Sequence, residues 1–353
     1  MTWEKIVNRP VSRWMEATGP ESDVVLSSRI RLARNLSDLP FPARMNETQA
    51  NELLRQVEAG VKEVNLMGLP TRVELFRLMD SSPLARHVLV DKHLISPDLA
   101  KEATGKAVAV SEDESIAVMV NEEDHLRIQC LLSGLNLTEA WRLGSTVDDA
   151  LEQKLNYAFH MQRGYLTACP TNVGTGLRAS VMVHLPGLVL TQQAGQLFHS
   201  LAQLGLVVRG LYGEGTEAAG HIFQISNQTS LGKTEEEYIE HLDAVARKVI
   251  EAERQARQHL HSEMKLQIED RVGRAYGLLS SARILTTEEA MKLLSDVRLG
   301  ISLGLFPALS YRSMNELMVT MQPAFLQQQA GRELNPLERD IRRAETVRDR
   351  LRS

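Results

Sequence analysis

The sequence predicts an α+β fold, in which an antiparallel β-sheet flanked by helices is followed by a smaller all-α domain. Apolar runs with the length and alternation of strands dominate residues 24–209, whereas helical periodicity dominates every segment after residue 265. Helical spacing also interrupts the strand-rich part at residues 47–63, 147–161 and 192–204. Such mixing of strands and helices is typical of the α+β class.

Six strands are expected in chain order, at residues 24–32, 107–110, 115–120, 126–132, 181–185 and 206–209. The second and third flank the short polar segment 111–114, which is typical of a hairpin turn. The sheet is therefore expected to be largely antiparallel.

A long amphipathic helix is expected to begin at Thr234, because Thr234 and Glu237 have the spacing of a capping box. Ile239, Leu242 and Val245 mark its apolar face, and its predicted end lies near residue 260. We therefore expect one domain at 1–260 and a helical domain at 265–353. Further helix starts in the second domain are indicated by the pairs Thr286 and Glu289, Ser313 and Glu316, and Asn335 and Glu338, the last followed by Pro336.

Composition excludes several classes of protein. The 353 residues are 43% hydrophobic and 24% charged, with a formal net charge of -5, which argues against disorder and against a nucleic-acid surface over the whole chain. No apolar stretch reaches the roughly 18 residues of a membrane span, and residues 1–5 lack a signal core, so a cytoplasmic protein is expected. Cys130 and Cys169 are too few for a disulfide framework or a cysteine metal cage, and no protein-ligated metal is predicted.

Two arginines share one face of the first strand. In Ser27-Ser28-Arg29-Ile30-Arg31 the two-residue period places Arg29 and Arg31 opposite Ile30. Two guanidinium groups on one face suit a polyphosphate, because arginine binds phosphate bidentately and keeps its charge. The same pattern also fits a solvated strand face.

Three further segments carry chemistry. In residues 121–127 three consecutive acids, Glu122, Glu123 and Asp124, follow an apolar strand and precede Arg127, a pattern that otherwise indicates a plain exposed turn. Residues 169–180 combine Cys169 with glycines that allow close backbone approach to an anion, and residues 209–217 form a glycine-dense loop after a buried strand. Gly232-Lys233-Thr234 is not a P-loop, because its first glycine is missing.

These segments, in this order, closely resemble the ATP:guanido phosphotransferases, the phosphagen kinase family, over residues 24–250. The resemblance implies a catalytic domain that binds ATP with Mg²⁺. The nucleotide contacts that it implies are Ser27, Ser28, Arg29, Ile30, Arg31, His93, Arg127, Arg178, Ala179, Ser180, Val181, Met182, Arg209, Gly210, Leu211, Tyr212, Gly213 and Glu214.

The same resemblance implies that Glu123 and Glu214 hold the acceptor guanidinium, with Cys169 beside it and Glu122 and Asp124 nearer the Mg²⁺ and its waters. Deprotonating a guanidinium at neutral pH costs on the order of 8 kcal/mol, which paired carboxylates offset as the proton leaves. A Cys169 thiolate would also stabilise the guanidinium charge. Glu123 is the expected base, although Glu122 is not excluded from that role.

Departures from the small-molecule enzymes favour a protein acceptor. Barely twenty residues precede the first arginine strand, where those enzymes resemble one another in a helical domain of about a hundred residues, and a helical domain is added after residue 265. The combination is similar to the bacterial protein arginine kinases. The resemblance implies substrate proteins with exposed arginines, among them a transcriptional repressor and damaged proteins, an activator protein and a downstream unfoldase-protease. It also allows a homodimer, and implies no direct nucleic-acid or membrane partner.

The C-terminal segment Arg339-Asp340-Ile341-Arg342-Arg343-Ala344 resembles the phosphoarginine-binding motif of those kinases. On a helix Asp340 and Arg343 lie three apart, so an acid and a base project together. The segment also fits a solvated charged helix face. Two other functions stay open: a kinase for free arginine or another small guanidino compound, and a non-catalytic adaptor that binds phosphoarginine.

Overall fold

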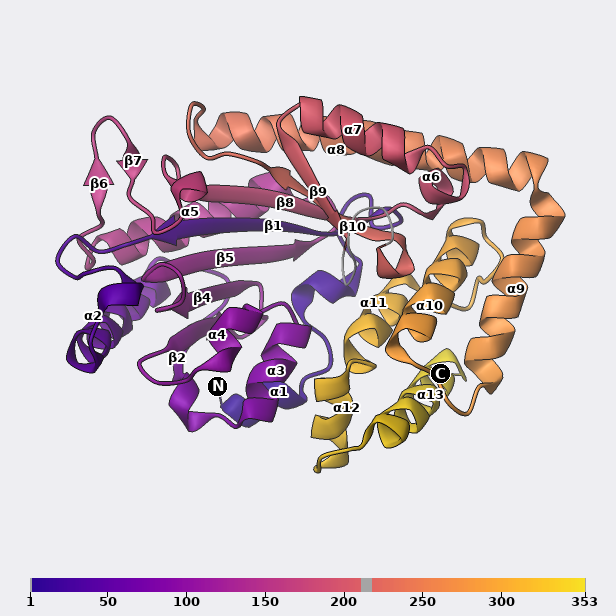
Figure 1. The fold of residues 1–353 in the computed structure, drawn as a ribbon, viewed down its shortest axis with the longest axis horizontal. Helices are drawn as coiled ribbons and strands as arrows, with labels where there is room; N and C mark the ends of the chain where they lie inside the picture. The colour runs from indigo at the N-terminus through magenta and orange to yellow at the C-terminus, as the bar shows by residue number, and fades with distance from the viewer. Residues whose placement is uncertain (1, 211–217, 353) are drawn as a thin grey trace.

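The computed structural model describes residues 2–210 and 218–352, and its centre is an eight-stranded sheet (Figure 1). All neighbouring strands in it pair antiparallel, in the order β2-β3-β4-β5-β1-β8-β10-β9. The strands are β1 (Val25–Arg34), β2 (Val73–Arg77), β3 (Ala107–Ser111), β4 (Ile116–Val120), β5 (Leu126–Ser133), β8 (Leu177–His184), β9 (Leu206–Gly210) and β10 (Ile222–Asn227). A small separate hairpin joins β6 (Phe159–His160) and β7 (Gly164–Tyr165).

The sequence prediction of the sheet is confirmed in its main features. The α+β class, the antiparallel pairing and the β3–β4 hairpin all appear as expected. Strands β2 and β10 were not predicted, and β8 begins at Leu177, four residues before its predicted start. Both unpredicted strands are short, and β2 carries charged side chains at an edge of the sheet, where one side of the strand is unpaired.

Helices of the first 263 residues cover the sheet. They are α1 (Trp3–Asn8), α2 (Glu47–Leu66), α3 (Pro83–Asp91), α4 (Pro97–Lys101), α5 (Leu137–Glu152), α6 (Pro186–Leu190), α7 (Ala194–Gln203) and α8 (Glu235–Glu263). The helix predicted at 147–161 lies instead at 137–152, because the chain turns after Glu152 and residues 159–160 enter β6. The predicted capping box of Thr234 and Glu237 starts α8, so Thr234 is a helix cap.

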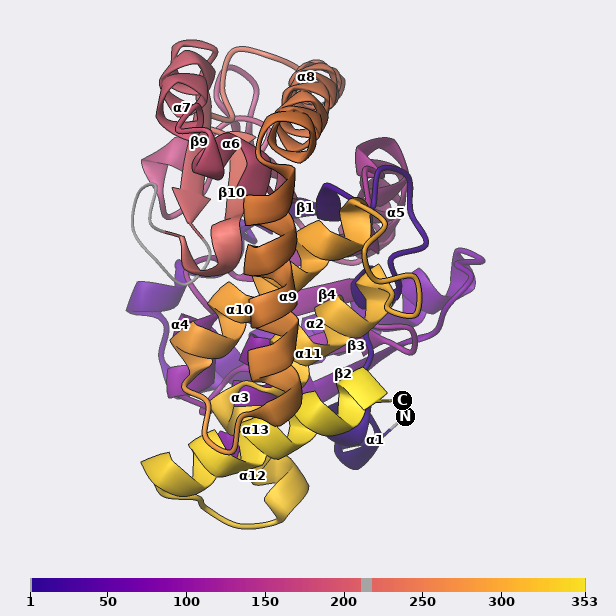
Figure 2. The same ribbon diagram turned by 90° about the vertical axis from the view of Figure 1, so that its right-hand side faces the viewer.

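The remaining helices pack beside the sheet, as Figure 2 shows from the side of α9. They are α9 (Lys265–Ser281), α10 (Thr287–Ser302), α11 (Tyr311–Thr320), α12 (Pro323–Ala330) and α13 (Pro336–Arg352). Asn335 and Glu338 cap α13 reciprocally, as predicted. The predicted start at Ser313 is wrong, because Ser310 accepts the hydrogen bond from the Ser313 backbone and α11 begins one residue after Ser310.

The two faces of the sheet differ in what covers them. One face, with Ile30 and Leu32 among its side chains, packs against α2, α5 and α8 in a single apolar core. The other face meets α3 and α4 over β2–β4, and it meets the C-terminal helices through Leu26, Met182 and Ile222. The polar side chains described below lie on this second face.

A β-bulge in β1 separates the two kinds of contact. Val25 pairs with Val183 and Ser27 pairs with Met182, so Leu26 is an extra residue in the ladder. Val25 joins the core under α5 and α8, whereas Leu26 joins the core of the C-terminal helices. After the bulge the side chains of β1 alternate regularly between the two faces, and Arg29 and Arg31 lie on the second face.

Candidate active site

Strand register brings four arginines together on the second face of the sheet. Arg31 of β1 lies directly opposite Arg178 of β8, and Arg127 of β5 pairs with Ala33, two residues further along β1. Arg29 lies on the same face as Arg31, as the sequence predicted. Arg209 of β9 pairs with Gln224, and Gln224 accepts a hydrogen bond from Nη2 of Arg29 at 2.5 Å. The five predicted phosphate-binding arginines therefore come from four neighbouring or near-neighbouring strands.

The arginines lack sufficient partners within the described chain. The Nε groups of Arg29, Arg31 and Arg178 are buried without a hydrogen-bond acceptor among the described residues. Burial, together with the positive charges of Arg178 and Arg127, lowers the pKa of Arg29 to about 10. The pKa of Arg178 is also lowered, first by burial and then by Arg209. A polyphosphate anion would accept hydrogen bonds from these unpaired N–H groups and would offset the repulsion between the arginine charges.

Two cavities adjoin these arginines. One, of about 240 Å³, is lined by Arg29, Arg31 and Arg127 together with His93 and residues of α3 and α4. The other, of about 120 Å³, is lined by Arg31, Arg127 and Arg178 together with Glu123 and Cys169. The first suits a nucleotide beside His93, and the second places an acid and a thiol next to the arginines.

His93 is held in an uncommon backbone conformation beside the larger cavity. Its φ of 61° lies in the left-handed region, its carbonyl accepts from Nε2 of Gln129 at 2.7 Å, and its ring lies 5.4 Å from the Trp14 ring. Burial, together with the positive charge of Arg29, lowers the pKa of His93 to about 4. The imidazole is therefore neutral at pH 7 and adds no charge to the arginine cluster.

The acidic turn between β4 and β5 carries Glu122 and Glu123, which both contact Arg127. Nη1 of Arg127 lies 2.6 Å from Glu122, and Nη2 lies 3.1 Å from Glu123. Glu122 is 6% exposed and also accepts from Ser96 at 2.6 Å, whereas Glu123 is 46% exposed. Partial burial raises the pKa of Glu123, and Arg127 opposes that rise. Glu123 is the more accessible of the two carboxylates, which favours it as the group that meets an acceptor.

Asp124 joins segments of the chain that are distant in sequence. It is buried, and its Oδ1 accepts from Nδ2 of Asn35 at 2.6 Å and from the backbone N–H of Ala168 at 2.7 Å. It thereby fixes the segment that leads to Cys169. The Cys169 Sγ lies 3.0 Å from Oγ1 of Thr171, at the wall of the smaller cavity.

The glycines after Cys169 lie close to neighbouring backbone. A Cβ at Gly174 would lie 2.2 Å from the Ser230 carbonyl oxygen, and a Cβ at Gly176 would lie 2.6 Å from that of Ala33. The N–H of Gly174 is bonded to the Tyr165 carbonyl. These glycines permit close packing of neighbouring backbone, so the expectation that both glycines present N–H groups to an anion is wrong for Gly174.

Several predicted nucleotide contacts point their side chains away from the site. Ile30, Ala179 and Val181 belong to the apolar core, and Ser28 donates to the Gly134 carbonyl. Met182 packs with the C-terminal helices, while Ser27 and Ser180 are buried in paired strands of the second face. Gly210 ends β9. Leu211, Tyr212, Gly213 and Glu214 lie outside the described residues, so the second predicted acceptor carboxylate has no described position.

Sequence reasoning missed polar residues that share the arginine face. Gln129 lines the larger cavity, Gln224 contacts Arg29, and the Ser226 hydroxyl accepts from Nη2 of Arg178 at 3.2 Å. Alternation along residues 126–132 was sufficient to place Gln129 on the same face as Arg127. Gln224 and Ser226 were hidden because their strand was not predicted.

The C-terminal motif lies on α13 and is partly internal. Arg343 is buried; it pairs with Asp340 at 2.5 Å and donates to the carbonyls of Met321 at 2.9 Å and Leu285 at 2.7 Å. Ala344 joins the core of the C-terminal helices, and Ile341 is exposed. The predicted proximity of Asp340 and Arg343 is confirmed, but Arg343 already holds several acceptors.

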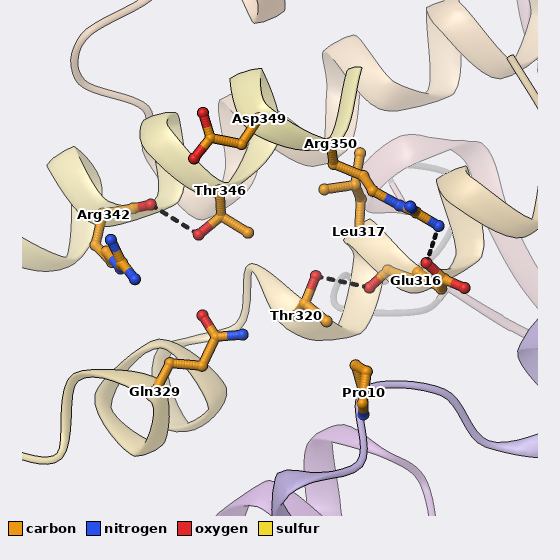
Figure 3. Close-up of a pocket in the computed structure, with 9 residues that line it drawn as sticks. All are labelled: Pro10, Glu316, Leu317, Thr320, Gln329, Arg342, Thr346, Asp349 and Arg350. Carbon is orange, nitrogen blue, oxygen red and sulfur yellow. Dashed lines mark hydrogen bonds and ion pairs between the residues drawn. The ribbon is translucent and has the colours of Figure 1, made fainter. Parts of the chain in front are cut away.

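A cavity of about 430 Å³ opens beside this helix, between α11, α12, α13 and Pro10 (Figure 3). Arg342 is the one motif residue in its wall; Thr346, Asp349 and Arg350 extend the wall along α13, and Glu316 faces them from α11. Arg339, Asp340 and Arg343 are not part of this wall. The cavity and the acid–base pair of the motif are therefore separate features.

Within residues 2–210 and 218–352, no three His, Cys, Asp or Glu side chains are grouped to hold a metal ion. No helix of that described part is long and apolar enough to cross a membrane.

Two family models match the chain. The model of the ATP:guanido phosphotransferase C-terminal catalytic domain matches residues 56–256, and the model of the protein-arginine kinase McsB C-terminal domain matches residues 265–353. A protein named protein-arginine kinase from Symbiobacterium thermophilum is 70% identical over 351 residues, covering 99% of each chain. One of the same name from Bacillus subtilis is 52% identical and covers 99% of this chain and 96% of its own.

Solved structures agree on the fold. A lombricine kinase structure has a TM-score of 0.58 at 25% identity and covers 70% of this chain and 69% of its own. A duplicated taurocyamine kinase from Schistosoma mansoni has a TM-score of 0.58 at 22% identity, over 80% of this chain and 41% of its own. The chain thus belongs to the ATP:guanido phosphotransferase family, in the group whose members are named protein-arginine kinases.

Proposed function

We propose that the protein transfers the γ-phosphoryl group of Mg·ATP to the guanidinium of arginine residues in proteins. The observation that carries this proposal is the smaller cavity, where Glu123 and Cys169 adjoin Arg31, Arg127 and Arg178. An acceptor guanidinium needs a carboxylate that removes its proton, and a transferring phosphoryl group needs fixed positive charge. Both are present within one cavity. The relatives named protein-arginine kinase favour arginines in proteins as the acceptors.

The arginine face would hold the triphosphate. Arg29 and Arg31 lie next to His93 on the nucleotide side, and Arg127 and Arg178 lie next to Glu123 on the acceptor side. The triphosphate fits this face because the Nε groups of Arg29, Arg31 and Arg178 have no acceptor among the described residues, and phosphate oxygens would accept hydrogen bonds from them. Bound Mg²⁺ would supply further charge neutralisation at the phosphates.

Glu123 would act on the acceptor. It contacts Arg127, a guanidinium 3.1 Å away, so the carboxylate already holds a group of the acceptor's chemical type. We propose that a substrate arginine takes this place, that Glu123 removes its proton, and that Glu214 provides a second carboxylate. Glu122 keeps its contacts with Ser96 and Arg127 and orients the latter. Cys169 would stabilise the guanidinium charge as a thiolate.

The decisive experiment uses a loosely folded test protein incubated with Mg·ATP and analysed by mass spectrometry under non-acidic conditions. We expect phosphate on arginine with the wild-type chain and none with Glu123→Gln. Phosphate on serine or threonine would refute the proposal. Rapid phosphorylation of free arginine, with protein arginines untouched, would establish the small-molecule kinase instead, and binding of phosphoarginine without any transfer would establish the adaptor.

We propose a division of labour along the chain as well, with residues 1–260 catalytic and residues 265–353 used for protein docking, phosphoarginine binding and self-association into a homodimer. Asp340 and Arg343, which lie 2.5 Å apart, support the phosphoarginine proposal, with Arg339 as a further cation on the same helix. Occupancy of that motif would regulate the kinase allosterically. Cytoplasmic stress response is the proposed setting, with a transcriptional repressor as substrate, an activator protein and an unfoldase-protease that receives marked proteins.

A further inference from the structure

A fourth cavity, of about 500 Å³, adjoins the acidic turn and shares Glu123 with the smaller cavity of the site. We call it the flank groove. Its walls come from residues 42–50 at the start of α2, residues 102–106 between α4 and β3, the acidic turn at 121–123, and Ala168. Glu123 is therefore the boundary between a pocket that faces the arginine cluster and a larger groove that faces away from the nucleotide side.

The flank groove carries an excess of negative charge. Its wall contains Glu47, Glu102, Glu122 and Glu123 but a single cation, Lys106. Glu122 and Glu123 are compensated by Arg127. Glu47 and Glu102 are exposed, and neither has an ion-pair partner within the described part of the chain. The two outer carboxylates are thus available to a cation from outside the molecule.

Stability does not explain both outer carboxylates. Glu47 lies in the first turn of α2, where a negative charge favours the helix. Glu102 lies at the C-cap of α4, the end of a helix where a negative charge is unfavourable. Its position costs stability locally, which is consistent with a role in recognition.

We infer that the flank groove receives the substrate residues on either side of the acceptor arginine, and that Glu47 and Glu102 select acceptors flanked by lysine or arginine. The inference rests on the proposed function, since it takes Glu123 as the group that meets the acceptor. An extended chain advances about 3.3 Å per residue, so residues next to an arginine bound at Glu123 fall within a cavity of this size.

The test compares peptides with one acceptor arginine flanked by either lysines or serines. For the wild type we expect a higher kcat/KM with lysine flanks, and this preference should shrink as ionic strength rises, because exposed charges are screened. The double variant Glu47→Gln/Glu102→Gln should lose roughly three- to tenfold in kcat/KM on lysine-flanked peptides and little on serine-flanked ones. Glu58→Gln, an exposed carboxylate on α2 outside the groove, is the matched control and should keep the preference.

Equal use of both peptides by the wild type would overturn the inference, and so would an unchanged preference in the double variant. Either result leaves the proposed function intact, because arginine is still phosphorylated. Absence of phosphoarginine on every peptide and protein would instead overturn the proposed function, and this inference with it.

Discussion

Replacing Lys92 with methionine tests how the segment that carries His93 is anchored. The Lys92 ammonium is fully buried and donates to Glu114 at 2.6 Å, to the Ile6 carbonyl at 2.8 Å and to the Arg9 carbonyl at 3.1 Å. An ammonium has three N–H donors, so each of them is used. The residue thereby ties the N-terminal segment and β3–β4 turn to the wall of the nucleotide cavity.

The magnitude follows from burial. Methionine keeps the length of the side chain but leaves Glu114, 1% exposed, without its counter-charge. Removing one partner of a buried ion pair costs about 3–5 kcal/mol, so the free energy of unfolding should fall by that amount. Urea unfolding, followed by tryptophan fluorescence, measures it. The double variant Lys92→Met/Glu114→Gln should recover a large part of the loss, because no uncompensated charge is left.

Lys101→Met provides the control, since its pair with Asp98 is exposed on both sides and its loss should leave the urea midpoint nearly unchanged. A loss below about 1 kcal/mol for Lys92→Met would refute the reasoning. So would a double variant as unstable as the single one, because the cost would then not come from the stranded Glu114 charge.

Four further outcomes are expected. Glu123→Ala should abolish phosphoarginine formation while ATP affinity, measured by calorimetry, changes less than about tenfold, or about 1.4 kcal/mol; a larger change would assign Glu123 to the phosphates. Arg178→Lys should lower kcat/KM strongly although charge is kept, because the bidentate guanidinium is lost, and near wild-type rates would place Arg178 outside the phosphate site. Burial raises the pKa of Asp91 to about 7, from about 3.9 in the unfolded chain, so the stability that its neutral form contributes is full below about pH 4 and is lost as pH rises through 7. Asp91→Asn should therefore remove this pH dependence of the urea midpoint. Parallel pH profiles of the variant and the wild type would contradict the assignment. Asp340→Ala should abolish binding of free phosphoarginine without affecting ATP binding, and equal binding by both chains would reduce the motif to a charged helix face.

The local part of the site was predictable from sequence. Alternation in residues 27–32 places Arg29 and Arg31 opposite Ile30 and Leu32, and the structure confirms this because the pleat of a strand depends only on chain geometry. The family resemblance supplied the other arginines. That Arg31 lies opposite Arg178, and that Arg29 reaches Gln224, depends on the register of strands about 150 to 195 residues apart in the chain.

Contacts between segments that are distant in the chain explain the features that the sequence could not indicate. Lys92 and Glu114 look like ordinary surface charges in the sequence, and only the folded chain brings Ile6 and Arg9 over them. The Oδ1 of Asp124 accepts from Asn35 and from Ala168, and both contacts join segments that are distant in the chain. Helical spacing predicted that Arg343 lies beside Asp340, but its backbone acceptors, Met321 and Leu285, come from the ends of other helices.

The bulge at Leu26 gives β1 a mechanical role. Leu26 is packed among the C-terminal helices, and Arg29 follows it by three residues, a distance of about 10 Å along a strand. A strand is stiff along its length, so a displacement of those helices against the sheet reaches the guanidinium groups through covalent backbone and needs no chain of side-chain contacts.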